Sequence, residues 1–529
     1  MRLFRNFATV GAATLSSRFL GFFRDILIAA SIGTGPVADA FFVAFRLPNL
    51  FRRLFAEGAF NAAFVPLFAK EVESNGKAGS RAFAEQILAI LFWTLLILTI
   101  VAEIAAPVLV YILAPGFYSD PAKFDLAVLL SRITFPYLLC MSILAFISGI
   151  LNTFHRFAAA AFAPVLLNVV MIAVLSGVVI LGLGPTEMTG IILAVGVTIA
   201  GIVQVLALIF ALKHFGFQIK LGRPRVTPHV KRLLALGIPG VIAGGITQIN
   251  IAVGTIIASA QAGAVSYLYY ADRIYQLPLG VVGIAIGVVL LPNISRQLKA
   301  GDMNQVFQTQ NRSLEFGLAL TLPAAVALVV IPEPIISVLF ERGAFGADDT
   351  ALTTAALAAF GLGLPAFVLI KVFSPGFFAR EDTKTPMWFA GVSMVVNVAG
   401  SLVLFPLIGH VGIALSTSVA GWINAILLGG TLWKRGYFRS DTALLTRLPL
   451  LCIASVLMGA IIWYGADTLS GPLHDPLLAI RFSALAGLVA LGMASFAFFV
   501  QVTGAVDLLG HLRKAIAGRS ASSTTPSQD

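Results

Sequence analysis

Charged residues are scarce in this 529-residue chain. Asp, Glu, Lys and Arg together make up 11% of it, whereas a soluble domain carries roughly 25%. Hydrophobic residues make up 58%. This balance excludes a soluble enzyme, a disordered protein and a nucleic-acid-binding domain, so the sequence predicts a polytopic membrane protein.

Cysteine and catalytic motifs are equally sparse. The two cysteines, Cys140 and Cys452, lie in apolar runs without CxxC spacing, which indicates neither a disulfide framework nor a metal site. The six histidines are scattered, and no HExxH or P-loop pattern occurs. The acidic clusters at 348–349 and 380–382 are typical of solvated turns. We therefore predict that the protein is not an enzyme and holds no metal or cofactor.

Long apolar runs dominate what is present. A membrane-spanning helix needs about 20 apolar residues, and polar breaks divide the chain into about fourteen such segments. The N-terminus resembles a signal peptide but continues without a cleavage site, so we expect a retained first helix. The expected spans are 7–33, 37–68, 83–113, 125–152, 159–182, 189–212, 231–261, 266–295, 313–340, 350–378, 386–406, 411–433, 445–466 and 479–508.

The 35 Lys and Arg residues outnumber the 24 Asp and Glu residues, and most of them lie in alternate loops. Loops of the opposite set carry only Lys123, Arg342 and Arg481, at or near their ends. By the positive-inside rule, this alternation predicts that both termini are cytoplasmic. The polar residues 511–529 form the expected cytoplasmic tail.

An internal repeat divides the chain. Landmark residues recur at nearly constant offsets of 226 to 229, and the pairs are Arg46–Arg273, Pro66–Pro292, Pro136–Pro365 and Asn168–Asn397. Such an offset predicts two six-helix lobes of the same orientation, related by an axis along the membrane normal. We place the lobes at 1–220 and 221–440, followed by helices 13 and 14 at 441–510.

When the cations of the loops and span ends are set aside, eight cations remain inside predicted spans, where each costs roughly 2.5–3.5 kcal/mol to insert. They are Arg18, Arg24, Arg46, Arg52, Arg53, Arg132, Arg273 and Lys371. We expect a water-filled cavity between the two lobes to receive them. Snorkelling to the headgroups is an open alternative, chiefly for Arg46, Arg132 and Lys371.

The expected ligand of this cavity is an anion. Acids within the spans are too few to neutralise the cations, and arginine outnumbers lysine by seven to one. The guanidinium fork binds phosphate oxygens in pairs, so a diphosphate is favoured over a simple carboxylate. Ser17, Asn49 and Tyr269 could hydrogen-bond sugar hydroxyls, although such residues also pack inside membrane bundles.

Several motifs resemble the MurJ (MviN-type) lipid II flippases of the multidrug/oligosaccharidyl-lipid/polysaccharide exporter superfamily. They are SRFLGFFRD (17–25), DAFFVAFRLPNLFRRLFAEGAF (39–60), LNTFHRF (151–157), FAPVLLN (162–168), YYADR (269–273) and GFFAREDTKTP (376–386). The resemblance implies an all-α integral membrane protein of the bacterial cytoplasmic (inner) membrane, with two lobes around a cationic cavity. It implies that undecaprenyl-diphosphate-linked peptidoglycan precursor moves from the inner to the outer leaflet.

The resemblance also assigns residues. It implies substrate binding by Arg18, Arg24, Arg52, Arg273 and Asp39, and gating by Glu57 and Arg380. From the residues themselves we add Asn49 to the substrate-binding set, and Ser17 and Asp25 to the gating set. Helices 13 and 14 would form the groove for the polyprenyl tail. Some members bind sodium through a carboxylate, but here the matching positions Asn397, Ser401 and Thr417 include no acid. We therefore expect the membrane potential, rather than sodium, to drive the cycle.

The partners implied are lipid II, membrane lipids and the cell-wall synthesis machinery, without nucleic acid. Three alternatives stay open: a flippase for another polyprenyl-linked glycan, a drug exporter of the same superfamily, and a non-transporting scaffold in cell-wall assembly. A drug exporter for cations would need an acidic cavity, and a pure scaffold has no use for cations inside the bilayer.

Overall fold

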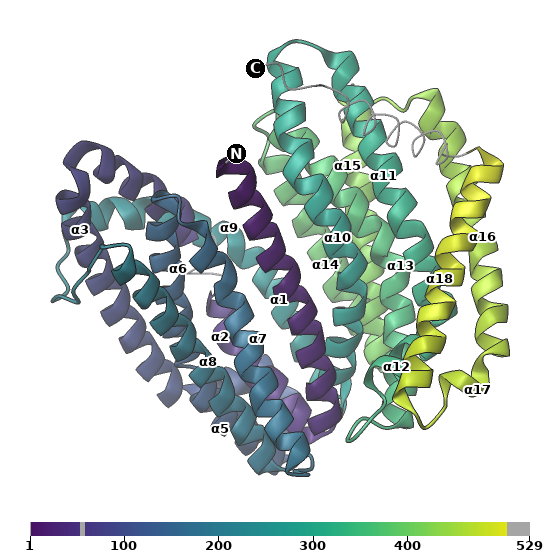
Figure 1. Cartoon of the computed structure of the whole chain (residues 1–529), viewed down its shortest axis with the longest axis horizontal. Coiled ribbons are helices and arrows are strands. Elements are labelled where there is room, and N and C mark those ends of the chain that lie inside the picture. Colours follow the sequence, from purple (N-terminus) through teal and green to yellow (C-terminus); the bar gives the residue numbers. More distant parts are fainter. Residues whose placement is uncertain (1, 53–58, 505–529) are drawn as a thin grey trace, which may run out of the picture. The chain divides into compact units, whose positions relative to one another are not determined.

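The protein is described by a computed structural model that covers residues 2–52 and 59–504 (Figure 1). Over these residues the regular structure is helical, apart from one isolated bridge between Arg342 and Phe345. The all-α prediction is confirmed. The elements in order are α1 (Arg2–Ile32), α2 (Pro36–Arg52), α3 (Ala59–Ile104), α4 (Ala106–Leu113), η2 (Pro115–Ser119), α5 (Pro121–Thr134), α6 (Tyr137–Thr153), α7 (Phe157–Ile180), α8 (Glu187–His214), α9 (Pro228–Ala258), α10 (Ala264–Lys299), α11 (Met303–Val330), α12 (Pro332–Phe340), α13 (Ala347–Phe378), α14 (Lys384–Ile408), α15 (His410–Lys434), α16 (Thr442–Thr468), α17 (Ser470–Leu473) and α18 (Leu478–Thr503).

In the described part of the chain, ten helical stretches are long and apolar enough to cross a membrane. They coincide with ten of the predicted spans. The helices α1, α9 and α10 occupy three of the other four predicted segments. The remaining predicted segment, 37–68, contains α2, which ends at Arg52, and the beginning of α3, which starts at Ala59. The count of fourteen spans stays a prediction.

The predicted loop between residues 68 and 83 is instead part of α3. The helix runs from Ala59 to Ile104 and is interrupted at Gly76, whose φ of 63° and ψ of −163° are not helical. Glycine has no Cβ and adopts a positive φ without the steric cost that other residues meet. A single residue therefore turns the chain between two helices, and Lys70 and Lys77 lie on helix rather than in a loop.

The chain forms two compact units. The first comprises Met1–Tyr269 with Phe340–Asp349, and the second comprises Tyr270–Leu339 with Thr350–Asp529. Packing therefore assigns α9 to the first unit, where it lies against α3. The lobe boundaries at 220 and 440 were drawn from the sequence repeat, and they stay a prediction.

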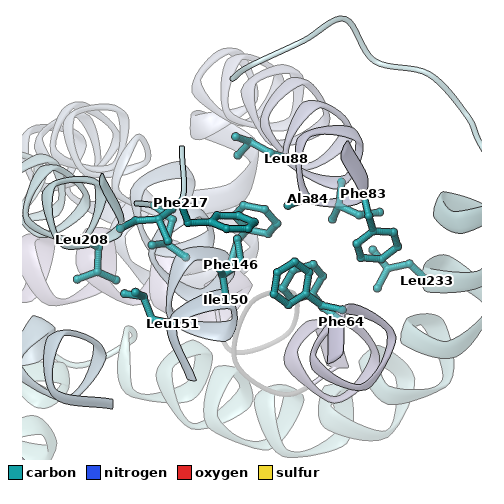
Figure 2. Close-up of a cluster of buried hydrophobic side chains, with 14 of the residues drawn as sticks. Phe64, Phe83, Ala84, Leu88, Phe146, Ile150, Leu151, Leu208, Phe217 and Leu233 are labelled. Carbon is teal, nitrogen blue, oxygen red and sulfur yellow. The ribbon is translucent and has the colours of Figure 1, made fainter. Parts of the chain in front are cut away.

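The core of the first unit is built around phenylalanine side chains (Figure 2). Phe64 of α3 stacks on Phe68 with ring centroids 5.4 Å apart and packs on Phe146 of α6 at 5.0 Å. Phe217, from the segment between α8 and α9, joins them and is 3% exposed. Aromatic pairs of this kind add about 0.5–1.5 kcal/mol beyond their buried area. They hold α3, α6 and the α8–α9 connection together.

In the second unit a core of aliphatic residues joins α10, α11, α13 and α15. The helices α16 and α18 pack side by side (Figure 1), and α16 also packs on α11. An ion pair fastens this last contact, because Arg447 of α16 lies 2.6 Å from Glu315 of α11. The two helices after the repeat are thus attached through α11.

Candidate functional site

Three residues predicted from the sequence meet in the C-terminal part of α1. Arg24 is 8% exposed and Asp25 is 2% exposed. The Nε and Nη2 groups of Arg24 donate to Oδ1 of Asp25 at 3.1 and 2.8 Å. The hydroxyl of Tyr269, a residue of α10, donates to the same oxygen at 3.2 Å. One carboxylate oxygen of Asp25 therefore accepts hydrogen bonds from both the guanidinium of Arg24 and the hydroxyl of Tyr269.

Asn168 of α7 completes this cluster. Its Oδ1 accepts from Nη1 of Arg24 at 3.1 Å, and its Nδ2 donates to the Ser17 carbonyl at 2.9 Å. Sequence reasoning treated Asn168 only as a repeat landmark. Its recurrence as Asn397 and its place in an apolar helix were the signals that could have marked it. The group of Ser17, Arg24, Asp25, Asn168 and Tyr269 is called the α1 cluster below.

The other predicted binding residues of the first unit lie on exposed or half-buried positions. Arg18 is exposed on α1, and Arg52 is half-buried at the end of α2. The Nε group of Arg52 donates to Oδ1 of Asn49, one turn earlier, at 3.2 Å. These two predicted residues are therefore neighbours, and both can face water.

Two of the cations for which snorkelling stayed open also belong to this unit. Arg46 donates to the hydroxyl of Thr255 on α9. Arg132 is exposed, and its Nε group donates to the backbone carbonyl of Glu103 at 3.1 Å. Arg46 thus ties α2 to α9, while Arg132 lies at the margin of its helices.

Asp39 is fully buried, at 0% exposure. Its carboxylate accepts from the ammonium of Lys123 at 2.6 Å, from the Gly263 N–H at 2.9 Å, and from the Ser266 N–H and hydroxyl at 3.1 and 2.6 Å. Lys123 is 7% exposed and was interpreted from the sequence only as a loop-end cation. The carboxylate of Asp39 is enclosed by these donors, and its predicted contact with substrate stays a prediction.

Next to Asp39, the backbones of two turns are in close contact: the turn that follows α1 and the turn that precedes α13. An ideal Cβ on Gly33 would lie 2.3 Å from the carbonyl oxygen of Ala344, and one on Gly343 would lie 2.3 Å from that of Ala30. The Ala344 N–H donates to this Ala30 carbonyl at 2.9 Å. Both glycines have positive φ, at 58° and 59°. No other residue fits these two positions without displacement.

A second contact repeats this arrangement elsewhere in the first unit. An ideal Cβ on Gly116 of η2 would lie 2.3 Å from the Ser259 carbonyl oxygen, and the Gly116 N–H donates to the Ser259 hydroxyl at 3.0 Å. Gly343 follows Gly116 by 227 positions, and Ser259 follows Ala30 by 229. We call the two contacts and Asp39 with its donors the loop clasp. In both contacts a loop glycine of one repeat meets the end of the first helix of the other.

In the second unit, the predicted binding residue Arg273 is half-buried on α10. Its neighbour Asp272 accepts a hydrogen bond from Gln276. Lys371 of α13 is exposed, and its aliphatic chain lies against Gly283, where an added Cβ would come within 3.1 Å.

Arg380, predicted to act in gating, lies just beyond α13. Its Nη1 donates to the Gly376 carbonyl at 2.7 Å, and its guanidinium lies 4.2 Å from the ring centroid of Tyr437. Partial burial lowers the pKa of this guanidinium from its ordinary value. Glu57, which is also predicted to act in gating, and Arg53 lie outside the described residues.

The residues at the positions of a sodium site are polar but uncharged. The Thr417 hydroxyl donates to Oδ1 of Asn397 at 3.2 Å, and Ser401 is 2% exposed. Within residues 2–52 and 59–504, no group of three or more His, Cys, Asp or Glu side chains is placed to hold a metal ion.

Comparison of the folds first defines the class of protein. The structure resembles an inward-facing multidrug resistance transporter of the MATE family, with a TM-score of 0.64 over 79% of this chain and 94% of that one. The two share 16% sequence identity, so the likeness concerns the fold alone. The described residues thus share the all-helical fold of that protein.

The chain belongs to the lipid II flippase MurJ family, whose model matches residues 28–476. It is 53% identical to a probable lipid II flippase MurJ of Rhizobium meliloti (strain 1021), over 99% of this chain and 98% of the relative. A lipid II flippase MurJ of Burkholderia cenocepacia is 37% identical over 88% and 90%. A solved structure of lipid II flippase MurJ in an inward closed conformation has a TM-score of 0.77 and 26% identity, over 93% and 98%.

Proposed function

We propose that this chain moves lipid II, the polyprenyl-diphosphate-linked precursor of peptidoglycan, from the inner to the outer leaflet of the bacterial cytoplasmic membrane. Membership of the MurJ family over nearly the whole chain supports this substrate. The α1 cluster is the observation that supports the proposal for the site. There the guanidinium of Arg24, on an apolar helix, is held by groups that a diphosphate can replace.

Arg24 presents the group suited to the substrate. A guanidinium stays charged in a partly dry site and binds two phosphate oxygens at once. In the present arrangement Asp25 and Asn168 occupy its donors. A diphosphate would take the place of Asp25 on this fork and leave that carboxylate to Tyr269. Binding of the anion would thereby be transmitted from α1 to α10, which carries Tyr269.

Arg18, Arg52 and Arg273 are proposed as the remaining diphosphate ligands, and Asn49 as a ligand for sugar hydroxyls. Arg18 is exposed, and both Arg52 and Arg273 are half-buried, so each can be reached from water. The side chain of Arg52 is oriented by Asn49 at 3.2 Å. Cations inside apolar helices are costly and are retained where they face water or an ionic ligand.

The loop clasp is proposed as the gate on the outer side of the membrane. It lies at the C-terminal ends of α1 and α9. The distribution of basic loops predicts that the N-terminal end of α1 is cytoplasmic, which would put the clasp on the outer side. Backbone contacts without side chains leave no channel between the two turns. Alternating access then requires the clasp to separate while the substrate is delivered.

The membrane potential is proposed as the driving force. Moving one elementary charge across 100 mV is worth about 2.3 kcal/mol. An inside-negative potential favours outward movement of an anionic substrate and inward return of the empty cationic site. Reconstituted protein that flips lipid II equally well after the potential is collapsed would refute this part of the mechanism.

The substrate is tested with purified protein in proteoliposomes that carry a fluorescent lipid II analogue. Transport is measured as the fraction that becomes accessible to a membrane-impermeant quencher. We expect flipping by the wild type and its loss in Arg24→Ala, with activity retained in Arg132→Ala, a cation outside the α1 cluster. In cells, depletion of the protein should cause lipid II to accumulate in the inner leaflet. Depletion without accumulation would favour a scaffold.

A further inference from the structure

The segment between α8 and α9, residues 215–227, is not used by the proposed transport site. We call it the basic strap. It belongs to the first unit and lies along α3. It combines cations, exposed apolar side chains and attachment to α3. The transport mechanism proposed above gives this surface no role.

Both ends of the basic strap are fixed. Phe217 is buried among the phenylalanine side chains of α3 and α6 (Figure 2), with its ring 6.1 Å from that of Phe68. At the other end the Thr227 hydroxyl caps α9 by accepting from the Val230 N–H at 3.4 Å. Such ends hold the residues between them in a defined place.

Three hydrogen bonds fix the position of the basic strap along the axis of α3. The Lys220 N–H donates to the Glu85 carboxylate at 3.0 Å, and the Thr227 hydroxyl donates to Gln86 at 3.1 Å. The Trp93 indole donates to the Gly222 carbonyl at 3.3 Å. Trp93 follows Glu85 by eight residues, which is about 12 Å along a helix. The strap therefore reaches from Glu85 and Gln86, in the middle of α3, toward the apolar stretch that follows them.

The cations of the basic strap lack acidic partners. Lys220, Arg223 and Arg225 are exposed, and none forms an ion pair with an acid in the described part of the chain. The sequence contains no Asp or Glu between Glu187 and Asp272. The nearby Glu85 is already engaged by Arg81 at 3.1 Å and by the strap's backbone. The strap therefore carries three uncompensated positive charges.

Apolar side chains flank these cations. Leu221 is 49% exposed, Val226 is 69% exposed, and Trp93 below them is 39% exposed. Trp is enriched where hydrocarbon meets headgroups. Cations beside exposed apolar side chains, at the point where the second half of α3 becomes apolar, match the boundary where phospholipid phosphates lie.

We propose that the basic strap binds the phosphate of an anionic phospholipid on the lipid-facing side of α3. Arg223 and Arg225 would hold the phosphate oxygens, Lys220 would add charge, and Leu221 and Val226 would contact the acyl chains. The diphosphate of a polyprenyl lipid offers the same chemistry, so the choice between the two sources falls to the test. The proposal does not depend on transport.

The test uses purified full-length protein equilibrated in mixed micelles of phosphatidylglycerol and phosphatidylcholine in equal amounts. Retained lipids are counted by native mass spectrometry. A cation near an anionic headgroup is worth about fivefold in affinity. The triple variant Lys220→Gln, Arg223→Gln, Arg225→Gln should therefore lose at least tenfold of the preference for phosphatidylglycerol. A matched triple variant, Lys299→Gln, Lys384→Gln, Lys434→Gln, removes the same charge from exposed positions elsewhere and should keep that preference.

Trp93→Phe provides a second measurement, because it removes the hydrogen bond to Gly222 and leaves an aromatic ring. It should weaken phosphatidylglycerol retention while all three cations are present. Equal retention by the wild type and the strap variant would overturn the proposal, as would equal loss in both triple variants. Added undecaprenyl diphosphate that binds through the strap in place of phosphatidylglycerol would also overturn it and assign the strap to substrate uptake. Flipping assays report on the proposed transport function separately.

Discussion

Asp39 accepts hydrogen bonds from both the backbone N–H and the hydroxyl of Ser266, at 3.1 and 2.6 Å. Ser266 follows Asp39 by 227 positions, the same offset that separates Arg46 from Arg273 and Gly116 from Gly343. A residue thus contacts its own counterpart in the repeat. Within the loop clasp, Asp39 therefore joins two segments that the sequence repeat relates.

The ion pair of Asp39 should hold the clasp closed. Asp39→Asn leaves the ammonium of Lys123 buried without a counter-charge, and breaking a buried pair in this way costs about 3–5 kcal/mol. We expect a lower unfolding temperature and faster maleimide labelling of a cysteine placed at position 35, with Cys140 and Cys452 replaced by serine. The double variant Asp39→Asn, Lys123→Met should recover stability. The exposed Asp125→Asn is the control, and unchanged labelling in Asp39→Asn would contradict the clasp.

The backbone contact of Gly343 should tolerate no side chain. Gly343→Ala places a methyl group 2.3 Å from the Ala30 carbonyl oxygen, so the clasp must open or shift. We expect loss of flipping and increased labelling at the clasp. Gly301→Ala has a similar positive φ of 74° but open space around it, and Gly346→Ala lies in the same loop with nothing within 4 Å. If Gly301→Ala also abolishes flipping, the loss in Gly343→Ala comes from backbone strain at a positive φ and not from the contact with Ala30.

Asp25 competes with the proposed substrate for Arg24. Asp25→Asn removes the negative charge that lies 2.8 Å from the guanidinium, so the affinity for a diphosphate should rise severalfold while the turnover of flipping falls. Binding is measured by titration of undecaprenyl diphosphate, and flipping in proteoliposomes. Tyr269→Phe is the companion variant, because it removes one donor to Asp25 and keeps the charge. Weaker diphosphate binding by Asp25→Asn would refute the exchange.

Arg24 and Arg273 should both be required in cells. Arg24→Ala and Arg273→Ala are expected to insert normally into the membrane and to fail to support growth when the chromosomal copy is depleted. Membrane insertion is checked by immunoblotting of membrane fractions. Growth with either variant at the wild-type rate would remove that residue from the proposed site.

Asp382, between α13 and α14, should confer stability that depends on pH. The N–H and hydroxyl of Thr385 and the guanidinium of Arg435 donate to its carboxylate, and they lower its pKa to about 2. A carboxylate with a lowered pKa in the folded state stabilises above its ordinary pKa, near 4. That stability disappears as the pH falls from about 4 to about 2. Asp382→Asn should flatten the unfolding temperature over this range, whereas Glu381→Gln, at the exposed neighbour, should not.

Much of the architecture could be predicted because a bilayer constrains each residue separately. The cost of burying charge in hydrocarbon marks the apolar spans, the basic loops and the rare cations within them. These constraints predicted the helical structure, and they marked Arg24 and Asp25 as candidate site residues. The helical link through Gly76 was missed, because a single glycine dihedral angle is not visible in a hydropathy pattern.

The sequence by itself determined that the chain is helical, spans a membrane, repeats internally and carries arginine where it is costly. Only the tertiary structure decided which groups those charges meet. Asn168 reaches Arg24 across 144 positions and Lys123 reaches Asp39 across 84, while Gly343 meets Ala30 in the loop clasp. Composition records the cost of a buried charge, but the partner that offsets this cost comes from packing between distant helices.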